Sequence, residues 1–519
     1  MRVFVALAAL CAAVPAQAEW RQASSRHFVI YSEQRPEQLR QFADELERFD
    51  EAVRILYLLP EQPVSKGNRV TIFDVGSATK VQQLIHDQSG MIAGFYRGRA
   101  GGSVAFASRT DRNDIRMTET GSIVDHSWTL AMRDNTVLFH EYAHHLMMQD
   151  IANPYPKWLA EGFAEVLATA RVDRDGSVAI GLPADYRVPG LELGQQLPLE
   201  TLLSDKFGKL NNEQWESIYG KGWVLTQYLT FDPSRKGQLK SYVSLLTRGV
   251  PSLDAARQAF GDIRKLEKDL DDYMDRGRVR GLNIPGPQIK IAPIEISGVS
   301  AGAAAILPVL MQLKSGAGDN PDVIAKEARA VAQTYRGDPL VETTLSDAEF
   351  DAKNYVAAEA AADRALASDP NSTKAMILKG RSRIENLVKA GAPASDFVDA
   401  RNWFLKANKI DPENPEPLYE FYASFGRQGI APTANAIAAL HYASDLAPQD
   451  EGVRLTSAEQ YLAEGKGKDA RTTLIPVAYD PHGGELADLA KRMIARIDTG
   501  DTAGAMKEAE RKTAAGVGS

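Results

Sequence analysis

The segment Val137–Met147 contains three histidines and one glutamate. His140 and His144 are four residues apart, so on a helix they share one face with Cβ atoms about 5–6 Å apart. Two imidazoles at this spacing can bind one zinc ion at Zn–N distances of about 2.0–2.1 Å. Glu141 follows the first histidine and flanks the same point, where a general base for a water molecule is needed. The spacing therefore predicts a zinc-binding helix with Glu141 as the general base.

The segment Trp158–Glu165 offers a third ligand for the same ion. A catalytic zinc ion takes three protein ligands and keeps one position open, and two histidines with one glutamate form a known set. We therefore predict that Glu161 binds the metal from a second helix, beside Gly162, which removes bulk there. Glu165 is predicted to accept a hydrogen bond from the free ring nitrogen of His140 and so to fix its tautomer. The alternative is that both glutamates lie on a solvated helix face.

Hydrophobic spacing indicates the elements that position these residues. Residues 27–108 are predicted to form alternating strands and helices, with a helix over 36–58. From about residue 134 the apolar residues recur at three- and four-residue steps, which predicts helices. These helices are expected at residues 135–150, 157–170, 213–231, 236–248 and 262–277. A small sheet followed by helices is an α+β fold.

The pair of segments His140–His144 and Trp158–Ala164 resembles the gluzincin zinc peptidases, in particular the aminopeptidase N group and its bacterial peptidase-MA-like relatives. The resemblance covers residues 69–275 or so and implies a thermolysin-like fold with one zinc ion and Glu161 as its third ligand. In this family a tyrosine in a Tyr-x-Lys-Gly sequence stabilises the oxyanion. Tyr219–Gly222 matches that sequence, so the resemblance implies this role for Tyr219.

The sequence departs from the aminopeptidases in two respects. It lacks the Gly-x-Met-Glu-Asn sequence that binds the free amino group of their substrates, and its spacing to Glu161 is shorter than theirs. Endopeptidase action is therefore favoured over aminopeptidase action. Gluzincins place an edge strand upstream of the metal helix, and we expect Gly101–Ser108 to form it and to pair with extended substrate. The more distant histidines, His482 among them, have no ligand-like spacing.

After about residue 318 the sequence becomes rich in alanine, and its apolar spacing is helical. Four proline turns, at Pro370, Pro412, Pro448 and Pro481, follow one another at intervals of 33 to 42 residues. Tetratricopeptide (TPR) repeats use helix pairs of about 34 residues, so this region resembles a TPR array. The alternative is a generic helical bundle. A TPR array implies a protein partner on its surface.

The first 18 residues are typical of a cleaved secretory signal. Arg2 precedes an apolar run too short to span a bilayer, and Ala16–Ala18 is a small-residue cleavage site. Cys11, the only cysteine, lies within this signal, so the mature chain is expected to contain no disulfide and no cysteine nucleophile. No other stretch is apolar for long enough to cross a membrane. The net charge of −8 gives no reason to expect nucleic acid binding, and we expect a periplasmic or secreted protein.

The predicted organisation is a signal peptide (1–18), a gluzincin-like peptidase domain (19–284), a linker or bridging segment (285–317), TPR-like repeats (318–500) and a tail (501–519). The predicted function is hydrolysis of peptide bonds in envelope or extracellular proteins or peptides by a zinc-activated water. The repeats are expected to recruit substrate or a protein partner. The alternative is a non-catalytic TPR scaffold whose metal domain is structural or degenerate.

Overall fold

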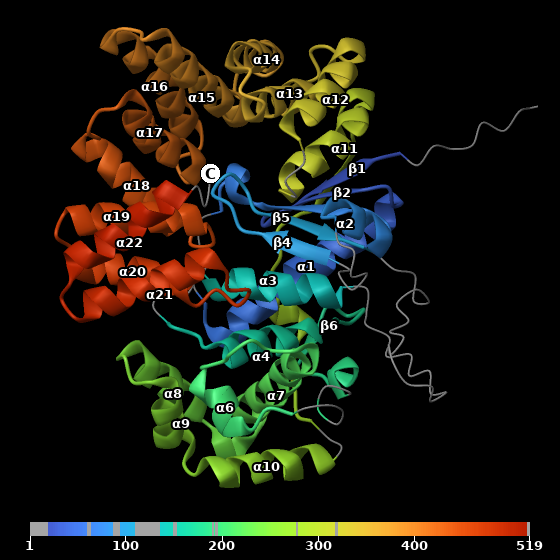
Figure 1. Ribbon diagram of the computed structural model, residues 1–519. Helices are drawn as coiled ribbons and strands as arrows, with labels where there is room; N and C mark the ends of the chain where they lie inside the picture. The colour runs from blue at the N-terminus through green and yellow to red at the C-terminus, as the bar shows by residue number, and fades with distance from the viewer. Residues whose placement is uncertain are drawn as a thin grey trace, which may run out of the picture.

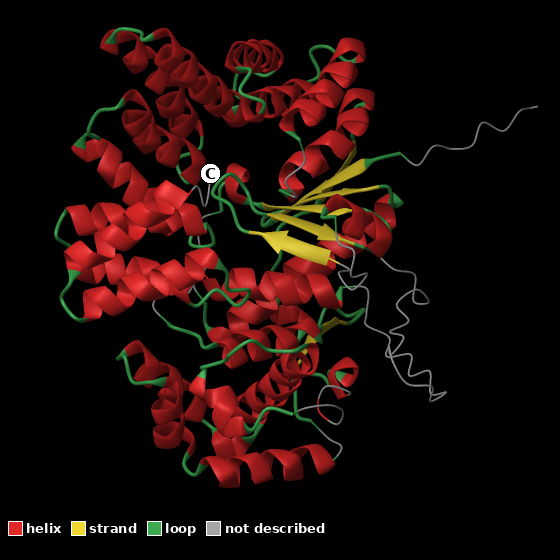
Figure 2. Ribbon diagram, in the orientation of Figure 1, coloured by secondary structure: helices red, strands yellow, loops and turns green. Residues whose placement is uncertain are grey.

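Six short strands form the main sheet, in the spatial order β4-β5-β3-β2-β1-β9. The computed structural model describes residues 19–59, 64–86, 94–108, 135–148, 153–188, 191, 196–276, 279–316 and 320–515. The strands are β1 (Arg21–Ser24), β2 (Phe28–Ser32), β3 (Val70–Asp74), β4 (Gly94–Arg97), β5 (Val104–Ala107) and β9 (Glu295–Gly298). The strands β2, β3 and β5 run parallel, whereas β1, β4 and β9 pair antiparallel with their neighbours. Figure 2 shows this sheet as a small part of a mostly helical molecule.

Helices cover both faces of the sheet. The helices of the first half are α1 (Pro36–Tyr57), α2 (Ala78–Leu84), α3 (Thr136–Met148), α4 (Lys157–Ala168), α6 (Leu199–Ser204), α7 (Asn212–Phe231), α8 (Gln238–Thr247), α9 (Ser252–Phe260) and α10 (Ile263–Asp275). Successive residues of a strand point to opposite faces. Ile72 of β3 therefore packs in the core with Leu46 of α1 and Leu146 of α3, while its neighbour Phe73 packs with Val81 of α2 on the other face. The core on the first face fixes α3, the helix that carries the predicted histidines.

A second, smaller sheet joins β6 (Arg171–Val172), β7 (Val178–Ile180) and β8 (Leu282–Ile284). Beside it, α7 begins at a capping box in which Asn211 and Gln214 satisfy each other's backbone N–H groups. The helices predicted near 135–150, 157–170, 213–231, 236–248 and 262–277 are confirmed, with ends within about three residues of the prediction.

The second half of the chain is an array of helices in which consecutive members pack together. They are α11 (Ala301–Ser315), α12 (Pro321–Thr334), α13 (Pro339–Asp351), α14 (Tyr355–Ser368), α15 (Thr373–Ala390), α16 (Ala394–Ile410), α17 (Pro415–Gln428), α18 (Ala434–Leu446), α19 (Glu451–Ala463), α20 (Gly467–Ala478), α21 (Glu485–Asp498) and α22 (Thr502–Ala515). Several begin with an Asn or Asp N-cap followed by proline, as Asn414 and Pro415 do in α17. Buried alanines such as Ala361 and Ala365 of α14 let neighbouring helices approach closely. Within the described part of the chain, none of the helices has the length and apolar character that a membrane span requires.

The predicted linker and tail are wrong in part. Residues 285–317 include β9, which pairs with β1, and α11, whose Leu307 and Met311 pack on the sheet. Sequence patterning missed β9 because it is short and largely exposed, so it shows no apolar alternation. Residues 502–515 form α22, and its Ala505 and Ala509 pack in the core of the last helices. The predicted signal peptide lies outside the described residues.

The predicted edge strand is also misplaced. The strand β5 lies between β3 and β4, so the edge of the sheet on this side is β4. The predicted turn between the two strands is present. It joins β4, the edge strand, to β5, which follows it in the sequence and lies inside the sheet.

The helices of the array form an arc (Figure 1). The connection between α18 and α19 packs directly against one end of the main sheet. The amide N of Ala100 donates a hydrogen bond to Asp450 Oδ2 at 2.7 Å, and Asn68 Nδ2 donates to the carbonyl oxygen of Leu446 at 2.9 Å. A Cβ added to Gly98 would lie 2.3 Å from the carbonyl oxygen of Gln449. The end of the sheet therefore fits the array closely.

Candidate metal centre

The helices α3 and α4 carry the predicted ligands and pack against each other in the core. Phe139 of α3 stacks on Phe49 of α1 with ring centroids 4.0 Å apart. Trp158 of α4 is fully buried, and its Nε1 donates a hydrogen bond to the hydroxyl of Tyr242 at 3.2 Å. These contacts fix the rotation of both helices and turn the histidine face of α3 toward α4.

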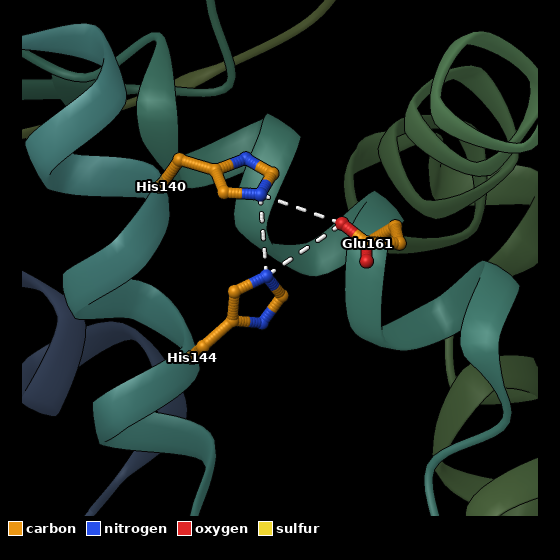
Figure 3. A group of neighbouring side chains, drawn as sticks. All are labelled: His140, His144 and Glu161. Atoms are coloured by element: carbon orange, nitrogen blue, oxygen red, sulfur yellow. Dashed lines mark hydrogen bonds and ion pairs between the residues drawn. The ribbon is translucent and has the colours of Figure 1, made fainter. Parts of the chain in front are cut away.

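His140, His144 and Glu161 converge on one point (Figure 3). The two Nε2 atoms lie 3.2 Å apart. Glu161 Oε2 is 3.4 Å from His140 Nε2 and 3.6 Å from His144 Nε2. The structure thus brings together the three side chains that the sequence assigned to a metal.

This geometry fits a zinc ion. Two bonds of about 2.0–2.1 Å at a tetrahedral angle place their ligand atoms about 3.3–3.4 Å apart, close to the separations observed here. Glu161 is completely buried, yet within the described residues neither of its oxygens has a hydrogen-bond partner. Its Oε2 faces the two imidazoles (Figure 3). An ionised carboxylate is costly to bury without compensation. In the metal-free protein the two imidazoles compensate Glu161, and a divalent cation bound at this point would take over that role.

Glu165 holds His140 from the far side of the ring. Its Oε1 lies 3.1 Å from His140 Nδ1, which is the contact predicted from sequence. The same carboxylate accepts hydrogen bonds from Arg187 Nη2 at 2.7 Å and from the hydroxyl of Tyr186 at 2.8 Å. A carboxylate fixed in this way orients the imidazole, so that Nε2 points to the centre. Sequence reasoning missed Tyr186 and Arg187 because they lie in a short 3-10 turn with no recognisable motif.

The surrounding charges keep both carboxylates ionised. Burial would raise the pKa of Glu165, but Arg187 and His140 outweigh it and lower this pKa to about 2. Burial acts in the same direction on Glu161, yet its contacts with His140 and His144 hold its pKa below the ordinary value. The ionised carboxylate is the form that binds a metal.

Two glycines explain how Glu161 can lie where it does. A Cβ added to Gly162 would lie 2.2 Å from the carbonyl oxygen of Gly222 and 2.3 Å from Thr226 Oγ1. A Cβ added to Gly222 would lie 2.7 Å from the carbonyl oxygen of Trp158. The helices α4 and α7 therefore meet backbone to backbone directly beside Glu161.

The same crossing places Tyr219 of α7 near the centre. Its ring centroid is 6.2 Å from that of His140. The guanidinium of Arg187 lies 4.4 Å from the centroid of the Tyr219 ring. Burial raises the pKa of the Tyr219 hydroxyl, so the group stays protonated and can donate a hydrogen bond.

Glu141 lies beside the ligands on a more open side, with 16% of its side chain exposed. It faces His482 of the array, whose Nε2 is 3.6 Å from Glu141 Oε2. His482 has no ligand-like spacing in the sequence, and the structure nevertheless places it at the centre. His145 points elsewhere, and its Nδ1 lies 2.6 Å from the hydroxyl of Tyr96.

Comparison with known proteins assigns no family to the chain. The sequence matches no family model, and no curated protein matches it. Among solved structures, one similar chain is a thermophilic TPR protein in Thermus thermophilus, with 14% identity, a TM-score of 0.32 and coverage of 37% of this chain and 98% of that one. Another is the MamA RS-1 ArsTM double mutant, with 16% identity, a TM-score of 0.26 and coverage of 37% of this chain and 96% of that one. Similarity at this level assigns no function, so the function has to be inferred from the site.

Proposed function

We propose that this protein is a zinc-dependent peptidase whose metal is held by His140, His144 and Glu161. The observation that carries the proposal is the buried carboxylate of Glu161, which faces two imidazoles and has no hydrogen-bond donor of its own in the described residues. Zinc, when bound, supplies a Lewis acid that polarises a carbonyl group and makes water more acidic.

Glu141 acts as the general base. It adjoins the ligands without being one, and its partly exposed side chain is within reach of water from the open side. Burial opposes ionisation of Glu141, but its charged neighbours, His482 foremost, outweigh it and lower its pKa, so it is ionised at neutral pH. A carboxylate oxygen then accepts the proton of the attacking water and later returns it to the leaving amine.

Tyr219 acts as the electrophilic partner. Its protonated hydroxyl donates a hydrogen bond to the substrate carbonyl oxygen as negative charge develops there. The Arg187 guanidinium against its ring supports the position of the tyrosine from behind.

The proposed substrates are envelope or extracellular proteins or peptides, because the sequence begins with a predicted export signal. Endopeptidase action is favoured over aminopeptidase action, since the sequence lacks the family's amine-binding motif. N-terminal sequencing of the exported protein is expected to begin at Glu19.

The test uses full-length zinc-loaded protein, a peptide library and detection of cleavage by mass spectrometry. We expect Glu141→Gln to keep its zinc and to lose cleavage by about 10²–10⁴-fold, the usual contribution of a general base. Glu37→Gln, on the exposed side of α1, is the matched control and should keep both zinc and activity. Glu161→Ala should lose zinc in elemental analysis. Equal cleavage by wild type and Glu141→Gln would reject the mechanism.

A second candidate function is a non-catalytic interaction scaffold. A groove of about 470 Å³ between α16, α17 and α18 is lined largely by apolar side chains, and Leu405 and Tyr442 beside it are 47% and 42% exposed. Apolar surface of this kind is typical of protein-binding sites. If the protein is a scaffold, Leu405→Glu should abolish partner capture, and cells that carry Glu141→Gln should behave like the wild type. If it is a peptidase, cells that carry Glu141→Gln should behave like a deletion of the gene, and Leu405→Glu should have the smaller effect.

A further inference from the structure

The loop between α20 and α21 reaches from the array to the candidate metal centre. His482 Nε2 lies 3.6 Å from Glu141 Oε2. The His482 ring also meets the His144 ring edge to face, with centroids 5.3 Å apart and an interplanar angle of 78°. The His482 side chain is 55% exposed, so it borders the open side of the centre rather than filling the core.

This loop is held in one conformation. The Asp480 side chain accepts hydrogen bonds from the backbone N–H groups of His482 at 2.8 Å and Gly483 at 3.1 Å. Gly483 and Gly484 have φ angles of +70° and +107°, which a residue with a side chain rarely adopts. His482 therefore points to the centre because of a turn that its own neighbours define.

The loop is also tied to the helix that carries Glu161. Lys157, the first residue of α4, donates a hydrogen bond from Nζ to the carbonyl oxygen of Pro481 at 2.7 Å. Tyr479 and Pro481 line a small cavity with His144 and Tyr155, so the contact includes apolar packing as well. Together with the docking of Ala100 on Asp450, this fixes the array at two separate places on the first half.

We propose that His482 is a positioning residue for Glu141, and that the array thereby completes the catalytic site. The inference rests on the proposed peptidase function. A general base must present its carboxylate in one orientation, and a second side chain that contacts it from a rigid loop limits its rotation. Within the described residues, no other side chain outside α3 forms an ion pair with Glu141.

The experiment compares His482→Ala and His482→Gln in the full-length zinc-loaded protein, with His441→Ala as the control. His441 is a histidine of α18 that contacts Ser457 and Glu464, away from the centre. We expect His482→Ala to lower kcat about tenfold or more with KM and zinc content unchanged. The side chain of His482→Gln keeps an N–H group that can face Glu141 Oε2 in place of Nε2, so this variant should recover most of the rate. His441→Ala should match the wild type.

A second measurement does not depend on activity. In metal-free protein, the loss of Tm in the Glu141→Ala, His482→Ala double variant should be smaller than the sum of the two single losses, because both changes remove one contact. Three results would each overturn the inference while leaving the peptidase function in place. They are additive losses of Tm, a kcat of His482→Ala within about twofold of wild type, and no recovery of the rate in His482→Gln. A wild type that cleaves nothing would overturn both.

Discussion

The tight crossing of α4 and α7 makes Gly162→Ala the sharpest test of how the metal centre is built. The added Cβ would lie 2.2 Å from the carbonyl oxygen of Gly222. This oxygen belongs to the backbone, so no side-chain rotation can relieve the contact. An ordinary contact is longer by about 1 Å, so the two helices must separate by that amount. Since Glu161 is the residue before Gly162, the separation shifts the third predicted ligand relative to the imidazoles.

The magnitude follows from two opposing effects. Alanine in a helix is favoured over glycine by about 0.5–1 kcal/mol. Overpacking of a close contact costs about 1–3 kcal/mol, and here the neighbouring atom is backbone. We therefore expect a net loss of about 1–2 kcal/mol, or roughly 2–8 °C in Tm for a unit of this size. Zinc affinity should fall about 10–100-fold, as it does when the support of a ligand is disturbed.

The assay is a zinc-chelator competition together with thermal unfolding of the metal-free protein. Gly426→Ala in α17 is the matched control, because a Cβ there meets nothing within 4 Å. The control should bind zinc normally and gain up to about 1 kcal/mol in stability. If Gly162→Ala behaves like Gly426→Ala, the crossing does not position Glu161 and our account of the centre is wrong.

Three further predictions concern single side chains. Glu165→Gln should weaken zinc binding about 10–100-fold in the same competition assay, because it removes the charge that orients His140. Tyr219→Phe should lower kcat about 10²–10³-fold without changing zinc content, and an unchanged kcat would remove Tyr219 from the mechanism. Burial lowers the pKa of His27, but Asp50 and Glu47 outweigh it and raise it above its ordinary value. Protonated His27 therefore stabilises the fold below about pH 6.5, and this contribution is lost as pH rises through the folded-state pKa. The loss of stability in His27→Asn should therefore be larger at about pH 5.5 than at about pH 8.5. A deficit that grows with pH would contradict this.

The parts of the site that could be predicted depend on the spacing of residues along single helices. His140 and His144 share a helix face because they are four residues apart, and helical periodicity also located α4 and hence Glu161. The contact of Glu165 with His140 followed from one further helical turn. None of these steps needs the tertiary fold beyond the packing of two neighbouring helices.

The parts that could not be predicted depend on contacts between distant segments. Arg187 lies in a short turn, and its pairing with Glu165 follows only from the path of the chain around α7. The strand β9 joins the main sheet across almost the whole first half of the chain, and its exposed residues carry no apolar pattern. The one available signal for His482 was its turn, since Gly483 and Gly484 distinguish it from the other proline turns of the array.

The docking of the array changes what its repeats can be expected to do. A recruiting module should present its surface to a partner, yet the edge near Asp450 and Leu446 is used by the end of the protein's own sheet. The loop at Pro481 is likewise used by Lys157 at the start of α4. A partner therefore has to bind elsewhere on the array, such as the groove between α16 and α18. Because the same loop carries His482 to Glu141, a partner that shifts the last helices would also change the geometry of the catalytic base. In the proposed peptidase, binding on the array and hydrolysis at the centre would then be coupled through one loop. A change in kcat without a change in zinc content on partner binding is the expected sign of that coupling.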